Sequence, residues 1–177
     1  MRLFAAIKFS PEIETVLTEV QNELKSNGIT GNYTDCRNLH LTLAFIGEYN
    51  APDKVMKALR NVSFEPFRMS LEESIGNFGD ILWLGIKKDS RLMALDKELR
   101  KALGNFNIHY DPKPFKPHIT LIRKAKVYDK NGVVIKTLKN RNVKMTVENI
   151  SLMHSHRENG KLIYTEIGRV QAVKNNV

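Results

Sequence analysis

The chain carries the same four-residue pattern twice, and this repeat constrains its fold more than any other feature. His40-Leu41-Thr42-Leu43 and His118-Ile119-Thr120-Leu121 both read histidine, apolar, threonine, apolar. Such alternation predicts a strand with one polar and one apolar face, because side chains along a strand point alternately to its two sides. We expect each copy to bury its aliphatic residues and to expose its histidine and threonine. If the two strands meet across a groove, the site holds two imidazoles and two hydroxyls.

The segments around the two copies indicate an α+β fold with antiparallel sheet. Helix-like spacing follows Ser10 and Ser90, which we read as N-caps, and ends at Gly28 and before Gly104. Further elements are predicted as strands at 2–9, 39–46, 67–75, 81–87, 118–122, 143–153 and 162–167, and as a helix at 52–61. Neighbouring strands form hairpins, which favours an antiparallel over a doubly wound parallel sheet. We expect residues 1–177 to form one domain.

Composition narrows the class of protein. No window approaches the roughly 18 apolar residues that a membrane span needs, so we expect no membrane function. The single cysteine, Cys36, cannot form an internal disulfide. We therefore expect a cytoplasmic protein, and a monomer.

The positive charge is concentrated in one segment. The chain has a formal net charge of +9, and residues 113–144 hold ten lysines and arginines against a single acid, Asp129. Such density attracts phosphate backbones, although it also suits an ordinary solvated face. The same region is polar from Lys126 to Asn142, with Asn131-Gly132 as a turn signal. We expect the excess positive charge to lie around or just beyond the second motif, where it would attract a ligand that carries phosphate.

The paired motifs are sufficient for acid/base cleavage of a phosphodiester without a metal or other cofactor. One histidine takes a proton from water while the other protonates the leaving oxygen, and an imidazole pKa near 6.5 suits both tasks. The hydroxyls of Thr42 and Thr120 can donate to phosphate oxygens, and Arg123 can add a charged fork. No carboxylate or second histidine stands at metal-ligand spacing beside either motif. Cys36 as a nucleophile lacks a base and an orienting acid.

Three other side chains stand out but are read as structural. His154 and His156 share a strand face and could hold a metal, but no third ligand is evident, so we interpret them as exposed strand residues. Trp83 lies within an apolar run and is interpreted as sheet packing.

The extended motifs resemble the 2H phosphoesterase superfamily, in particular its RNA 2′,3′-cyclic phosphodiesterase (2′-5′ RNA ligase-like) branch. The resemblance is carried by the start of the chain, both His-x-Thr motifs with their flanks, a tryptophan strand and the closing strands: residues 2–6, 38–48, 82–85, 116–123, and Ser155, Gly160 and Tyr164. It implies two pseudo-symmetric antiparallel-sheet lobes, with helices outside and a central groove. The approach to the first motif, residues 33–37, is more polar than is usual there, which puts the base contacts in doubt.

The resemblance also implies a role for each residue. His40 would be the proton donor to the departing 3′ oxygen, and His118 the proton acceptor that activates water. Thr42, Thr120 and Arg123 would bind the phosphate, and the product would be a 2′-phosphomonoester. Phe45 would stack on a base if strand twist turned it towards the groove, whereas simple alternation buries it.

Three hypotheses remain open on the sequence. The first is metal-independent hydrolysis of a 2′,3′-cyclic phosphate on an RNA end or a cyclic nucleotide. The second is another reaction of the same family, such as 2′-5′ RNA ligation or opening of a different cyclic phosphate. The third is an RNA-binding module without turnover, which the basic segment alone would explain.

Overall fold

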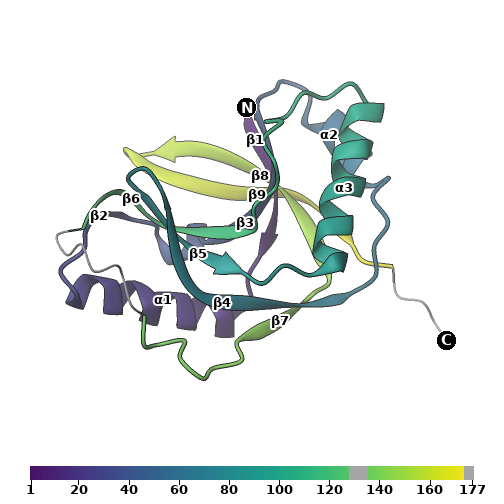
Figure 1. Cartoon of the computed structure of the whole chain (residues 1–177). Coiled ribbons are helices and arrows are strands. Elements are labelled where there is room, and N and C mark those ends of the chain that lie inside the picture. Colours follow the sequence, from purple (N-terminus) through teal and green to yellow (C-terminus); the bar gives the residue numbers. More distant parts are fainter. Residues whose placement is uncertain (128–134, 174–177) are drawn as a thin grey trace.

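In the computed structural model, which describes residues 1–127 and 135–173, the strands form two antiparallel sheets (Figure 1). The four-stranded sheet has the order β3-β1-β8-β9, with β1 at Arg2–Lys8, β3 at His40–Glu48, β8 at Asn149–Glu158 and β9 at Lys161–Gln171. The five-stranded sheet has the order β2-β6-β5-β4-β7, with β2 at Thr30–Tyr33, β4 at Phe67–Phe78, β5 at Ile81–Ile86, β6 at His118–Lys126 and β7 at Lys144–Val147. The α+β class and the antiparallel sheets are confirmed. The predicted turn at Asn131-Gly132 lies outside the described residues.

Three α-helices and one short 3-10 helix complete the described elements. They are α1 (Pro11–Ser26), η1 (Cys36–Asn38), α2 (Pro52–Leu59) and α3 (Ser90–Asn105). Helices α2 and α3 contact each other, and α3 also contacts β3 and β4. The apolar stripes of the helices and the inner faces of both sheets join one continuous core. None of the helices in the described part of the chain has the length and apolarity that a membrane crossing needs.

The helix starts differ from the prediction in which side chain caps them. Ser10 occupies the N-cap position of α1, but its hydroxyl makes no capping bond to the helix backbone. In α3 the cap is Asp89 rather than Ser90, because the Asp89 carboxylate accepts from the backbone N–H of Arg91 at 2.9 Å. A carboxylate complements the exposed N–H groups at a helix start better than a hydroxyl does.

The predicted strand at residues 143–153 is wrong as a single element. The chain passes from one sheet to the other at Glu148, so β7 pairs with β4 and β8 pairs with β1 and β9. Val147 pairs with Phe67 of β4 and Ile150 pairs with Val170 of β9, but both side chains are buried in the common core, so the apolar run does not reveal the division. Strand β9 extends to Gln171, beyond the predicted 162–167, because it pairs along the whole of β8.

Strand β2 was not predicted. Its four residues, Thr-Gly-Asn-Tyr, show no apolar alternation, and three of them are exposed. The strand forms because its backbone pairs with the edge of β6, with Tyr33 opposite Ile122. This pairing places the polar approach to the first motif against the strand that carries the second.

Candidate active site

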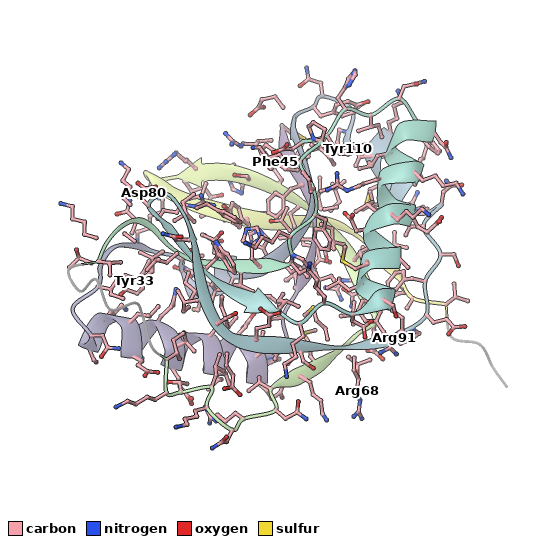
Figure 2. All side chains as sticks on the ribbon, viewed as in Figure 1. Tyr33, Phe45, Arg68, Asp80, Arg91 and Tyr110 are labelled. Carbon is pink, nitrogen blue, oxygen red and sulfur yellow. The ribbon has the colours of Figure 1, made fainter. Side chains whose placement is uncertain are left out.

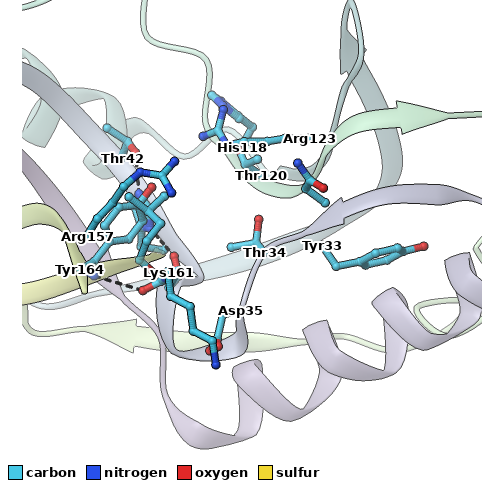
Figure 3. Close-up of a pocket in the computed structure, with 14 residues that line it drawn as sticks. Tyr33, Thr34, Asp35, Thr42, His118, Thr120, Arg123, Arg157, Lys161 and Tyr164 are labelled. Carbon is cyan, nitrogen blue, oxygen red and sulfur yellow. Dashed lines mark hydrogen bonds between the residues drawn. The ribbon is translucent and has the colours of Figure 1, made fainter. Parts of the chain in front are cut away.

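Both histidine motifs line one cavity of about 530 Å³ between the two sheets. His40 and Thr42 reach it from β3, and His118 and Thr120 reach it from β6. In both strands the intervening aliphatic side chains are buried, so the predicted alternation is confirmed over these four positions. Figure 3 shows His118, Thr120 and Arg123 on one side of the cavity, with Thr42, Arg157 and Tyr164 across from them.

The two imidazoles are held in the same way. Nδ1 of His40 lies 2.6 Å from the carbonyl oxygen of Asn38, and Nδ1 of His118 lies 2.6 Å from that of Lys116. A carbonyl oxygen can only accept, so Nδ1 must carry the hydrogen in both rings. Nε2 is therefore the nitrogen free to exchange a proton, and in His40 it lies 2.9 Å from the Thr42 hydroxyl.

Aromatic rings enclose each histidine. The His40 ring centroid lies 4.8 Å from Phe4 and 5.2 Å from Tyr164, and that of His118 lies 5.1 Å from Phe78. Burial is the main cause that lowers the pKa of His40 to about 4, and the positive charge of Arg123 contributes to this lowering. Burial also lowers the pKa of His118, with Lys116 and Arg123 adding to the effect. Without an anion in the cavity, the site favours neutral imidazoles.

A β-bulge at the same place in each motif strand brings a further residue to the cavity side. In β3, Ala44 pairs with Ala5 and Thr42 with Ala6, which leaves Leu43 as the extra residue. In β6, Leu121 is the extra residue in the same position of its motif. Because one extra residue reverses the facing of those that follow, the fifth residue after each histidine lies on the histidine's own side.

These fifth residues are Phe45 and Arg123. Simple alternation places Phe45 with the buried Leu41 and Leu43, and this is wrong because of the bulge. Phe45, labelled in Figure 2, is half-buried and packs against the cluster that contains Phe4. It lines a second cavity of about 380 Å³ that shares lining residues with the first. Arg123 lines both cavities. All six residues proposed from the sequence thus border the connected cavities.

The hairpin between β8 and β9 supplies lining residues that sequence reasoning missed. Arg157 and Lys161 flank its turn, and both line the larger cavity. Tyr164, on β9, lines both cavities beside His40. The sequence signal that could have pointed to Arg157 and Lys161 is their position on either side of the predicted Glu-Asn-Gly turn. That signal is weak, because charged residues are common at hairpin turns on protein surfaces.

Asn38 is a further cavity residue that was not proposed from the sequence. Its carboxamide donates to the Leu162 carbonyl at 2.8 Å and accepts from the Tyr164 N–H at 3.2 Å, so it pairs with the free edge of β9. Its own carbonyl holds the His40 ring. Asn38 therefore links the hairpin to the first histidine. In the second motif the corresponding carbonyl belongs to Lys116. Its backbone is restricted by the following Pro117, rather than by hydrogen bonds from its own side chain.

The basic segment does not gather at the site as a whole. Past residue 134 the chain runs beside α1, where the Arg141 guanidinium binds Glu19 and Thr137 donates to Glu23. Of the ten bases in residues 113–144, Arg123 lines the cavity and Lys116 lies over the Trp83 ring, 4.2 Å from its centroid. The expectation that the excess charge lies around or just beyond the second motif therefore holds for these two residues and fails for Arg141, which is paired at α1.

The remaining candidates fall outside the shared site or at its border. His154 and His156 stack with centroids 4.8 Å apart and are half-buried rather than exposed, and His156 lines the smaller cavity. Cys36 is exposed. Trp83 is buried in the sheet as predicted, and its ring also lies 5.9 Å from His118. Among the described residues, no group of three or more histidine, cysteine or acidic side chains is placed to hold a metal ion.

Comparisons with known proteins show the family of the chain and its fold. Residues 9–159 match the model of the 2′-5′ RNA ligase superfamily. A protein of Archaeoglobus fulgidus named RNA 2′,3′-cyclic phosphodiesterase is 30% identical over 131 residues, covering 70% of this chain and 72% of that protein. One of the same name from Aquifex aeolicus is 28% identical over 181 residues, covering 94% and 95%. The structure of Escherichia coli LigT in apo form superposes with a TM-score of 0.83 at 26% identity, covering 98% of each chain.

Proposed function

Since the chain belongs to the 2′-5′ RNA ligase superfamily, we propose that it hydrolyses 2′,3′-cyclic phosphates at RNA ends, or on nucleotides, to 2′-phosphomonoesters without a metal ion. The observation that carries this proposal is the pair of imidazoles that line one cavity, each with Nδ1 bonded to a backbone carbonyl so that Nε2 is the nitrogen able to exchange a proton. The relatives named RNA 2′,3′-cyclic phosphodiesterase support the substrate.

The proposed reaction is an in-line displacement at phosphorus. Nε2 of His118 accepts a proton from water as the new P–O bond forms, and Nε2 of His40 gives a proton to the 3′ oxygen as the P–O3′ bond breaks. The product carries a 2′-phosphate and a free 3′ hydroxyl, and proton exchange with water resets both rings. The hydroxyls of Thr42 and Thr120 and the guanidinium of Arg123 bind the phosphate oxygens, where charge accumulates in the transition state.

Phe45 is the proposed contact for the base. Its ring lies along the smaller cavity, and the Arg2 guanidinium lies 5.0 Å from its centroid. An aromatic ring and a neighbouring cation both suit a nucleobase, because the π face of the base stacks on the ring and attracts the cation.

We also propose that residues 1–177 act as one domain with two pseudo-symmetric lobes, and that the protein is a cytoplasmic monomer. Size-exclusion chromatography with light scattering tests the oligomeric state.

The test is hydrolysis of a cyclic phosphate by single-residue variants in the presence of EDTA. Loss of a general acid or base costs roughly 10²- to 10⁴-fold in rate, so H40A and H118A should each lose turnover by that factor. H109A is the matched control, because His109 is exposed and borders neither cavity. Full turnover in both active-site variants would overturn the assignment. Activity that EDTA abolishes and a divalent ion restores would overturn metal independence.

A further inference from the structure

The larger cavity holds more positive charge than one cyclic phosphate requires. A 2′,3′-cyclic phosphate is a diester with a single negative charge, and Arg123 already faces it together with the two histidines. Arg157 and Lys161 add two more cations to the same lining. Like charges around one cavity repel unless an anion lies between them, so the lining suits a ligand with a second negative group.

No acid in the described part of the chain neutralises these two cations. The ion pairs found there include neither Arg157 nor Lys161, and the Arg157 guanidinium donates to the backbone carbonyl of Gly160 at 2.8 Å. Asp35 is the acid that lines this cavity, and the Arg37 guanidinium binds it at 2.8 Å. That partner lowers the pKa of Asp35 to about 2, so its charge is already compensated.

The position of the hairpin indicates which part of the substrate meets these cations. Arg157 and Lys161 lie in the sheet that also carries His40, and the Tyr164 ring from the same hairpin packs edge-on against the His40 ring. In the proposed in-line reaction the departing 3′ oxygen lies on the His40 side. In that reaction the terminal ribose, and with it the ribose 5′ oxygen, would therefore lie on the side of the hairpin.

We propose that Arg157 and Lys161 form a subsite for a phosphate on the 5′ oxygen of the terminal nucleoside. This inference rests on the proposed function and specifies its substrate: an RNA end, or a nucleotide with a 5′-phosphate, is preferred over a nucleoside 2′,3′-cyclic phosphate. An arginine supplies a planar fork for two phosphate oxygens and a lysine supplies a point charge, a combination that binds a phosphate without reading its base.

The test compares kcat/KM for three substrates that share one cyclic phosphate. They are a nucleoside 2′,3′-cyclic phosphate, the same compound with a 5′-phosphate, and a short RNA that ends in the same nucleotide. The measured quantity is the preference, which is kcat/KM for each 5′-phosphorylated substrate divided by that for the nucleoside. Losing charged hydrogen bonds costs about ten- to hundredfold in such a ratio, so the R157Q/K161Q double variant should show a preference reduced by that factor.

The K97Q/K101Q double variant is the charge-matched control, since Lys97 and Lys101 are exposed on α3 and border neither cavity. It should keep the wild-type preference, and R157K/K161R should keep most of it. Raising the salt concentration should reduce the wild-type preference more than that of R157Q/K161Q, because fewer phosphate contacts remain to be screened.

The outcomes separate this subsite from the function on which it rests. If the wild-type protein turns over none of the three substrates, the proposed function fails. If it turns over all three and R157Q/K161Q keeps the wild-type preference, the subsite is overturned and the function stands. A reduced preference for RNA alone assigns the subsite to an internucleotide diester, and a reduced preference for both 5′-phosphorylated substrates assigns it to any 5′-phosphate. Both of these results support the proposal.

Discussion

Substrate binding should shift the pH dependence of this protein upwards, because both histidines lie in surroundings that disfavour their charged forms. The pKa of His40 falls from 6.5 to about 4, first through burial and then through the charges of Arg123 and His118. That difference corresponds to about 3 kcal/mol between the two protonation states. In the free protein at pH 7, the imidazole of the proposed proton donor is therefore neutral, with its hydrogen on Nδ1 and none on Nε2.

A bound phosphate reverses this effect. A single negative charge about 4 Å from the ring contributes about 4 kcal/mol to the imidazolium at an effective dielectric constant of about 20. This is enough to offset the burial of His40 and to return its pKa to the neutral range. The same anion also raises the pKa of His118, which burial lowers in the free protein.

Steady-state kinetics measure the two situations separately. The pH profile of kcat/KM reports the free protein and that of kcat reports the complex, and a 2′,3′-cyclic phosphate itself does not titrate between pH 4 and 9. We expect the bell-shaped pH profile of kcat to have its maximum at a pH at least about one unit higher than that of kcat/KM. Titration of ¹⁵N-labelled histidines by NMR, with and without inorganic phosphate, assigns the shift to His40.

The reasoning would be refuted if the pH profiles of kcat and kcat/KM coincided, or if His40 titrated near pH 6.5 in the free protein. The R123Q variant gives an internal check. Because the Arg123 guanidinium lowers the pKa of both histidines, its removal should raise both values in the free protein.

Three further predictions concern stability and positioning. The pKa of His40 is lower in the folded protein than in the unfolded chain, so the unfolded chain binds a proton first as the pH falls. The free energy of unfolding, measured with urea, should therefore fall by up to about 3 kcal/mol between pH 6.5 and 4. A free energy of unfolding that stays constant over this range would contradict this. N38A should lower kcat more than it raises KM, and N38D, which keeps the acceptor for the β9 N–H, should restore part of the loss. G76A should destabilise the fold by about 1–3 kcal/mol, because a Cβ at Gly76 would overlap the Trp83 indole. G104A is the control for that variant, since Gly104 lies in a helix with open space around it, and it should stabilise by about 0.5–1 kcal/mol as judged by chemical denaturation.

The side of the strand on which each motif residue lies is only partly predictable from the local sequence pattern. Alternation places His40 and Thr42 on one face correctly, because the period of a strand is a property of its own backbone. It fails at Phe45, because the bulge at Leu43 arises from pairing with β1, which is distant in sequence. The same kind of bulge brings Arg123 to the cavity, and a count of residues from His118 does not contain that information.

Charge shows the same division between local and long-range information. The run of bases in residues 113–144 is evident in the sequence, but part of it pairs with acids of α1 rather than facing the cavity. Arg157 and Lys161 stand outside that run and line the cavity instead. Charges act through distance in space, so a linear cluster does not by itself define a surface.

The sequence by itself determined the chemistry that this protein can support: two histidines, two threonines and an arginine, on strands whose apolar residues had to be buried. Only the tertiary structure decided that both strands border one cavity, which ring nitrogen is free, and which cations from the β8–β9 hairpin share the site. The physical reason is the range of the interactions. Burial of alternate side chains is encoded within a few residues, whereas strand pairing, bulges and cavity walls depend on segments that meet only when the chain folds.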